Sequence, residues 1–340
     1  MKSTQLKLLI ISIFILIGGW SCKKDAAKEE NLISIPPALQ KLKQYIPKDN
    51  PLSAEKIKIG KKLFFDERLS IDGTVSCSFC HNPLLGFSDG RYRSMGIYGL
   101  RSKRNSPTII NRLFGQYQFM DGRASNIEEV IVEHIQNSIE MGNNLENLVV
   151  TLNSDGTYRD EFQNVFGTQV TAEGISKSLA SYVRTLVSGN SAFDKFIAGN
   201  NGAISESAKR GYDLFKSERL KCSKCHSGDN FSDEKFQNNG AGMDSEAPDF
   251  GRYLETGNEE DKGKFKTPTL RDIARSSPYM HDGSIKSLAE VVEFYNQGGI
   301  PNKNLSEYVK PLNLTESEKT DLIEFLRSLT GTNIYYLSVR

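Results

Sequence analysis

The chain has 340 residues, which is enough for one large domain or two domains of ordinary size. Its 25% charged and 38% hydrophobic residues are typical of a soluble globular protein. The formal net charge of +1 gives no electrostatic reason to expect a nucleic acid or a strongly acidic partner, and no nucleic-acid partner is predicted.

Residues 1–21 are typical of a signal peptide: two lysines are followed by an apolar run from Leu8 to Ile17 that is too short to span a bilayer. The segment ends in Gly-Gly-Trp-Ser-Cys, which resembles the lipobox of bacterial lipoproteins, so we expect Cys22 to carry the lipid. Ordinary secretory cleavage nearby is the alternative. Residues 22–49 would then be a polar tether, and the lipid anchor would be the only membrane contact.

The four other cysteines occur as two pairs, and each pair is followed directly by a histidine. The two motifs are Cys77-Ser-Phe-Cys80-His81 and Cys222-Ser-Lys-Cys225-His226. Cys-x-x-Cys-His is the attachment signal of c-type haem, in which two thiols add to the vinyl groups of the porphyrin and the imidazole binds the iron. The sequence therefore predicts two covalently bound haem c groups, with the two motif histidines as proximal iron ligands.

Three other uses of cysteine pairs fit these motifs less well. A four-cysteine zinc site would use both pairs but would not explain a histidine after each. A thioredoxin-like redox pair needs a strand–helix context that is absent from the sequence. A disulfide within each short motif would be strained and of little structural use.

Two sequence repeats accompany the motifs. Residues 60–70 and 211–221, ahead of the motifs, both contain Gly-x-x-Leu-Phe and then Glu-Arg-Leu, and each predicts an amphipathic helix. After the motifs, residues 106–134 and 267–295 align on their Asp-Gly pairs and predict a helix after a glycine turn. This alignment pairs the last residues of the two segments, a histidine and a tyrosine. We therefore predict two pseudo-equivalent haem domains.

The rest of the chain also predicts helices and no run of alternating strands. Residues 175–188 are amphipathic, and residues 315–331 begin with a capping box and end at a glycine. A linker rich in Gly, Asn and Ser is expected at 198–209. The predicted fold is all-α, with a first haem domain at 50–200 and a second at 201–335.

Together these segments resemble the bacterial dihaem cytochrome c peroxidases and the related MauG proteins. The resemblance extends from about Pro51 to Gly331 and is carried by CSFCHNP, KRNSPT, FMDGRA, NSIEM, FDKFIAGN, CSKCHSG, FKTPTLRDI and PYMHDGS. It implies two cytochrome c-like domains, a peroxide-reacting haem in the first and an electron-transfer haem in the second. It also implies a periplasmic enzyme that reduces hydrogen peroxide to water with electrons from a small donor such as cytochrome c.

The resemblance extends to individual residues. Glu140, in NSIEM, matches the distal-pocket glutamate of the peroxide haem, where a carboxylate can move a proton between the two oxygens. Asn105 matches the side-chain ligand of a calcium ion between the domains, with backbone carbonyls expected near Thr267 and Pro268. Calcium rests on the resemblance alone, as does the expectation of a homodimer, which is common in the family.

Two departures concern the distal sides of the haems. The family often has a distal histidine in the loop after the first haem, but here no histidine lies between His81 and His134. The first haem is then permanently five-coordinate, or His134 approaches its iron; the alternative is a histidine on a helix surface. At the second haem Tyr295 replaces the usual methionine, with Met280 and Met243 as alternative ligands, and a phenolate ligand would lower the potential.

The third departure concerns the region between the haems. The family usually has a tryptophan there, but the matching residue is Met120, and the single tryptophan lies in the signal peptide. His281 fits a propionate or packing role better than ligation. Two alternatives to the peroxidase therefore stay open: a MauG-like dihaem oxidase that acts through high-valent iron on a protein or organic substrate, and a dihaem electron carrier that is not an enzyme.

Overall fold

The structure, a computed structural model, describes residues 32–332, so the predicted signal peptide and Cys22 lie outside it. Its α-helices are α1 (Ala54–Phe64), α2 (Cys77–Cys80), α3 (Ile127–Gln136), α4 (Leu145–Asn153), α5 (Gly156–Phe166), α6 (Ala172–Arg184), α7 (Ala192–Ile197), α8 (Glu206–Lys216), α9 (Tyr253–Thr256), α10 (Leu288–Asn296) and α11 (Glu316–Ser328). Within residues 32–332 the one sheet is an antiparallel pair, β1 (Phe236–Gln237) and β2 (Phe265–Lys266). The prediction of a mainly helical fold is confirmed.

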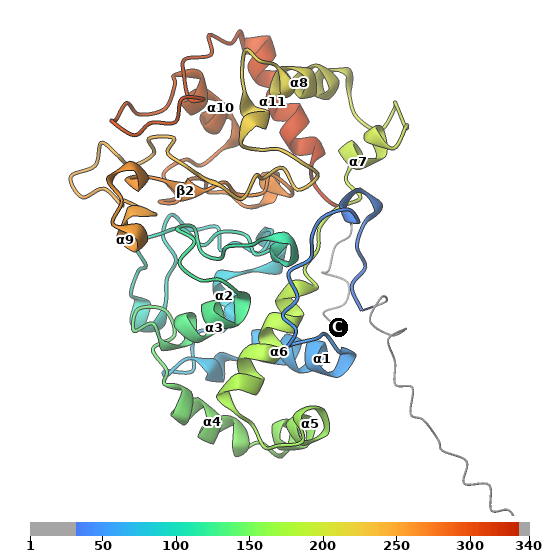
Figure 1. The fold of residues 1–340 in the computed structure, drawn as a ribbon, viewed down its shortest axis with the longest axis vertical. Coiled ribbons are helices and arrows are strands. Elements are labelled where there is room, and N and C mark those ends of the chain that lie inside the picture. The colour runs from blue at the N-terminus through green and yellow to red at the C-terminus, as the bar shows by residue number, and fades with distance from the viewer. Residues whose placement is uncertain (1–31, 333–340) are drawn as a thin grey trace, which may run out of the picture.

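The helices form two halves, each with its own hydrophobic core (Figure 1). In the first half α1 crosses α6, and in the second α8 crosses α11. Each crossing is close because a glycine faces backbone: a Cβ on Gly60 would collide with the carbonyl of Ser178, and one on Gly211 with the carbonyl of Asp321. The two halves therefore use the same close helix crossing at a glycine. Helix α7 lies ahead of the predicted linker, but its Phe193 packs into the second core.

Side-chain caps define where these helices begin. The predicted capping box of Thr315 and Glu318 is present at the start of α11. The helix expected at 175–188 begins earlier, at Ala172, because the hydroxyl of Thr171 accepts a hydrogen bond from the backbone of Gly174. It ends at Arg184, and the following residues turn into the connection between the halves.

Part of the predicted tether is packed against the protein. Leu39 is fully buried in a small cluster with Leu113, Phe114 and Val187. The apolar side chains that pack around this cluster are Ile33, Ile35, Leu42 and Ile46. Their burial gives residues 33–46 a fixed position on the surface of the two-half scaffold. No helix within residues 32–332 is both long and apolar enough to cross a membrane.

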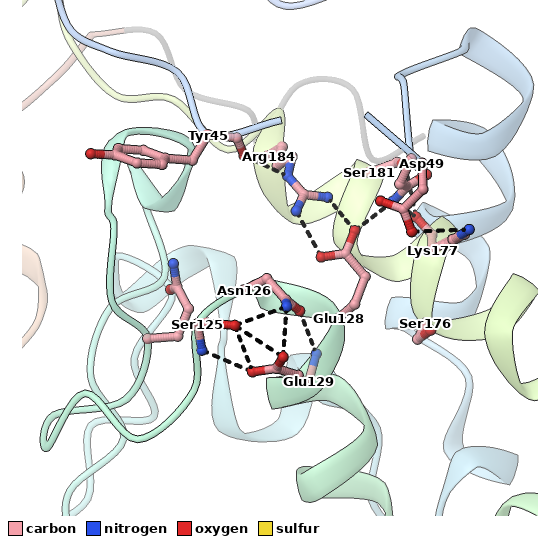
Figure 2. A network of polar contacts seen from close by, with 12 residues as sticks. Tyr45, Asp49, Ser125, Asn126, Glu128, Glu129, Ser176, Lys177, Ser181 and Arg184 are labelled. Carbon is pink, nitrogen blue, oxygen red and sulfur yellow. Dashed lines mark hydrogen bonds and ion pairs between the residues drawn. The ribbon is translucent and has the colours of Figure 1, made fainter. Parts of the chain in front are cut away.

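A buried ion pair fixes the helix that leads into the candidate site (Figure 2). The guanidinium of Arg184 on α6 donates to both carboxylate oxygens of Glu128 on α3, at 2.8 and 2.7 Å, and also to the carbonyl of Tyr45. Asn50 donates to Glu128 at 2.6 Å. Because Arg184 is only 1% exposed, this bidentate pair is shielded from solvent and holds α3 against α6 and the N-terminal segment.

Candidate active site

One cavity of about 1230 Å³ reaches both Cys-x-x-Cys-His motifs. This exceeds the roughly 300–1,000 Å³ of an ordinary small-molecule pocket, and apolar side chains make up most of its wall. The residues of the two motifs on the wall are Cys77, Cys80, His81, Cys222, Cys225 and His226. The fold therefore brings the two motifs, far apart in sequence, to one continuous space.

The first motif orients its histidine through a backbone hydrogen bond. Cys77 and Cys80 are the first and last residues of α2, and His81 ends that helix. The Nδ1–H of His81 donates to the carbonyl of Phe87 at 3.1 Å, which leaves Nε2 as the free nitrogen. Desolvation lowers the pKa of His81 to about 4, with His134 adding to the effect, so the imidazole is neutral as an iron ligand must be.

The second motif repeats this geometry. His226 follows a short 3₁₀ helix, Cys222–Lys224, and its Nδ1–H donates to the carbonyl of Phe231 at 3.1 Å. Desolvation again lowers the pKa of the imidazole. Each half therefore presents a neutral histidine with one free ring nitrogen beside a cysteine pair.

These donors fit two c-type haems. All four cysteines are free thiols, and desolvation raises the pKa of the Cys77 and Cys222 thiols to about 12 and about 11, so they are protonated and not bridged. Among residues 32–332, no three His, Cys, Asp or Glu side chains come together as a metal-ion site. The arrangement of the donors thus does not support the zinc alternative, since the two cysteine pairs belong to separate halves.

His134 and Glu140 meet on the wall of the cavity near the first motif. The Nδ1–H of His134 donates to Glu140 Oε2, and the His134 ring centre lies 6.4 Å from that of His81. Desolvation opposes ionisation of Glu140, but its electrostatic attraction to His134 and the hydrogen bond between them outweigh it, so the pKa of Glu140 lies below its ordinary value. A carboxylate with an imidazole partner can accept and release protons there.

A tight turn after α3 brings these two side chains together. The carbonyl of Asn137 accepts hydrogen bonds from the backbone N–H groups of Glu140, Met141 and Gly142. Gly142 has a φ of 60°, which favours glycine. The turn folds Glu140 back towards His134. The backbone N–H of Ile97, in the loop that follows the first motif, donates to the carbonyl of Glu140.

The corresponding wall near the second motif carries Tyr295, on α10. Asn239 donates its amide N–H to the Tyr295 hydroxyl at 3.0 Å and lies 3.5 Å from the sulfur of Met280. Desolvation raises the pKa of Tyr295, although the hydrogen bond from Asn239 opposes the shift. Tyr295 and Met280 both line the cavity, whereas Met243 lies against Gly263.

Residues between the halves include the expected calcium position. Asn105, Thr267 and Pro268 all line the cavity. The backbone N–H of Asn105 donates to the carbonyl of His281 at 2.8 Å, and its side-chain amide donates to the carbonyl of Arg91 at 2.8 Å. The carbonyl of Thr267 accepts a hydrogen bond from Ser232 at 2.7 Å, so this oxygen already has one partner.

Two further expected residues lie between the halves. His281 stacks on Phe265, with ring centres 3.9 Å apart and planes 13° from parallel. The carbonyl of Met120 accepts a hydrogen bond from the backbone of Lys266 at 2.7 Å. His281 thus has a packing position against Phe265. Met120 links the two halves through its backbone carbonyl.

Several partners of these residues were not predicted. Asn239 lies in an irregular segment with no motif, so its bond to Tyr295 has no sequence signal. Arg104 pairs with both Asp121 and Asp249, which joins the halves. The sequence shows Arg104 within the KRNSPT segment and Asp121 within the Asp-Gly repeat. The joint pairing of Arg104 with Asp121 and Asp249 could not be predicted, because it depends on how the two halves pack together.

Comparisons with known proteins show which proteins this chain is similar to. The sequence model of the di-haem cytochrome c peroxidase family matches residues 54–202. The chain is 36% identical to cytochrome-c peroxidase IdrP1 of Pseudomonas sp. (strain SCT), over 97% of this chain and 93% of that protein. It is 38% identical to methylamine utilization protein MauG of Methylorubrum extorquens, over 83% and 80%. A solved MauG-like protein associated with microbial copper homeostasis superposes with a TM-score of 0.82 at 30% identity, over 88% and 96%.

Proposed function

Since the chain belongs to the di-haem cytochrome c peroxidase family, we propose that it reduces hydrogen peroxide to water with electrons from a cytochrome c or a similar small periplasmic donor. The balanced reaction consumes one peroxide, two electrons and two protons and yields two waters. The observation that carries the proposal is the single cavity that joins both Cys-x-x-Cys-His motifs to the hydrogen-bonded pair of His134 and Glu140.

The two motifs would hold the haems. Cys77 and Cys80 would attach the first, and Cys222 and Cys225 the second. His81 and His226 would be the proximal ligands, because each keeps one ring nitrogen free while the other donates to a backbone carbonyl. The bound haems supply electron transfer to peroxide.

Protons in the first half are handled by the chain itself. Glu140, whose lowered pKa keeps it ionised, would accept a proton from one peroxide oxygen and deliver it to the other as the O–O bond breaks. His134 would hold the carboxylate in place through its Nδ1–H. Glu140 only moves a proton within the peroxide, so both protons that the reaction consumes come from solvent.

The second half would pass electrons to the first. Tyr295 is the proposed distal ligand, supported by its place on the cavity wall and by the amide of Asn239 beside its oxygen. We further propose that the domains are residues 50–200 and 201–335 and that they are related by a pseudo-repeat. The matched glycine crossings at Gly60 and Gly211 support this relation.

A second candidate function is MauG-like oxidation of a protein or organic substrate. Tyr295 at the second motif and the lack of any histidine between His81 and His134 favour it. So does the 38% identity to MauG of Methylorubrum extorquens. A dihaem electron carrier is the third reading, and the proton-handling pair of the first half argues against it.

Location and accessory features complete the proposal. We propose a periplasmic enzyme with a lipid anchor at Cys22, because residues 1–21 are typical of a signal peptide and end at that cysteine. A calcium ion between the halves would use Asn105 and the carbonyls near Thr267 and Pro268, which share the cavity wall. We also propose a homodimer, by analogy with the family.

The test is peroxide-dependent oxidation of a reduced c-type cytochrome by the purified dihaem protein. It is run on the fully oxidised enzyme and again after reduction by one electron. A peroxidase consumes two reduced cytochromes per peroxide in at least one of the two states. If neither state turns over but peroxide oxidises an added organic substrate, the MauG-like function replaces the peroxidase, and no reaction with peroxide leaves the carrier.

A further inference from the structure

We propose that His134 is the second axial ligand of the first haem iron in the resting enzyme, with Glu140 as the carboxylate that orients it. The inference rests on the proposed function, because it presumes a haem on the first motif. It changes the expected state of the site: the first iron would be six-coordinate between two histidines, and peroxide would have to displace one of them.

The distance between the two imidazoles carries the inference. The ring centres of His81 and His134 lie 6.4 Å apart. Two imidazoles that bind one metal from opposite sides, through bonds of about 2 Å, have ring centres separated by about 6 Å. A distal histidine that only donates a hydrogen bond to bound peroxide would lie farther from His81, because an oxygen atom would separate it from the iron.

Hydrogen bonds assign the nitrogens in the way that ligation requires. The Nδ1–H of His81 donates to Phe87, and the Nδ1–H of His134 donates to Glu140. Both rings therefore keep Nε2 available. Histidines that bind metals almost always donate the other N–H to a carboxylate or a carbonyl, and these two use one of each.

The second half provides an internal comparison. His134 and Tyr295 each stand seven positions after the first residue of their helix, Ile127 of α3 and Leu288 of α10. Both helices begin with a side-chain cap three residues before a glutamate, and both follow a glycine with positive φ. One scaffold position thus presents a donor atom to each half of the cavity, and a polar partner holds that donor in both cases.

Neighbouring groups restrain His134 in this position. Phe119 packs at 5.2 Å from the His134 ring, and Arg123 lies over Phe119 at 3.5 Å. Arg123 also pairs with Asp121 and Glu133. Release of His134 from the iron therefore requires its ring to turn against Phe119 or the end of α3 to shift.

The test uses spectroscopy on the ferric holoenzyme. Electron paramagnetic resonance and absorption spectra of the wild type should show a low-spin haem with two histidine ligands. In His134→Ala that signal should be replaced by a high-spin haem, and added imidazole should restore it. Cyanide should bind the ferric variant faster than the wild type, since no ligand has to leave. His281→Gln, which removes another cavity histidine, is the control and should leave the signal in place.

The outcomes separate the inference from the proposed function. A high-spin first haem in the wild type, unchanged in His134→Ala, overturns the inference while peroxidase turnover still supports the function. A low-spin signal that depends on His134, in an enzyme that never reacts with peroxide, supports the ligand and overturns the function. Glu140→Gln keeps the fold of the turn and should weaken the low-spin signal, because it removes the anionic acceptor.

Discussion

In the first half of the molecule the helix after the Asp-Gly turn presents His134, which is hydrogen-bonded to a carboxylate. In the second half the equivalent helix presents Tyr295, which is hydrogen-bonded to an amide. The aligned counterpart of Glu140 is Pro301, which is exposed and cannot carry a proton. One scaffold therefore carries a carboxylate at this position on one side only, and this difference supports our proposal that peroxide reacts in the first half and the second half transfers electrons.

The sharpest way to break the comparison is to remove the carboxylate. Glu140→Gln should lower kcat for peroxide by about 10²–10⁴-fold, because general acid–base catalysis contributes about that much. Steady-state kinetics with reduced cytochrome measure it. Glu146→Gln, at an exposed glutamate in the first turn of α4, is the matched control and should keep kcat within about twofold; an equal loss in both variants would contradict the assignment.

Each half also has a buried arginine–carboxylate pair, and the two pairs can be compared directly. Arg184 pairs with Glu128, and Arg271 pairs with Asp194, with Arg271 2% exposed at its side chain. Arg184→Met and Arg271→Met should each lower the free energy of unfolding by about 3–5 kcal/mol, because each leaves a buried carboxylate without its partner. Denaturant unfolding measures this.

Only one of these pairs should affect the site. Glu128 is on α3, the helix of His134, so Arg184→Met should also perturb the spectrum of the first haem while Arg271→Met leaves it unchanged. Equal spectra in both variants would show that the pair on α3 has no positioning role.

Replacing the distal residue of the second half sharpens the comparison from the other side. Tyr295→Met should raise the reduction potential of the second haem, within the range of about 0.8 V that axial ligands span, because a thioether favours the reduced iron more than a phenolate does. Redox titration followed by absorbance measures it. The first haem should keep its potential. Tyr295→Phe, which removes the hydroxyl and supplies no sulfur, separates the loss of the tyrosine ligand from its replacement by methionine.

The smallest expected effect is on acid stability. The pKa of Glu128 lies below its ordinary value of 4.5: desolvation raises it, but Arg184 and Asn50 lower it by more. The unfolded chain therefore binds more protons just below pH 4.5, so the stabilisation is complete above that pH and is lost as pH falls through the folded pKa. The free energy of unfolding, measured between pH 3 and 6, should therefore depend less steeply on pH in Glu128→Gln than in the wild type.

The sequence predicted the parts of the site that depend on local pattern. The two haem motifs, the helix-rich fold and the capping box of α11 follow from spacing and residue type within short windows. His134 and Glu140 were each named as candidates, one from the repeat and one from the resemblance. Their hydrogen bond was not predicted, since it depends on the turn in which Asn137 accepts three backbone N–H groups.

Contacts between distant segments could not be read from the chain. Asn239 reaches Tyr295 from an irregular segment, and His281 stacks on Phe265 from another segment of the same half. Residues 33–46 fall within the predicted tether 22–49, but five apolar side chains spaced along them pack with Leu113 and Val187. Such contacts are set by tertiary packing and leave no local period in the sequence.

The most direct test of the account is the reaction of peroxide with two variants that each lose one proximal histidine while the cysteines keep the haem attached. In rapid mixing, His81→Gly should abolish the reaction with peroxide. His226→Gly should retain it but fail to oxidise the reduced cytochrome. The opposite pattern, with peroxide reaction lost in His226→Gly and kept in His81→Gly, would contradict the assignment of the two halves.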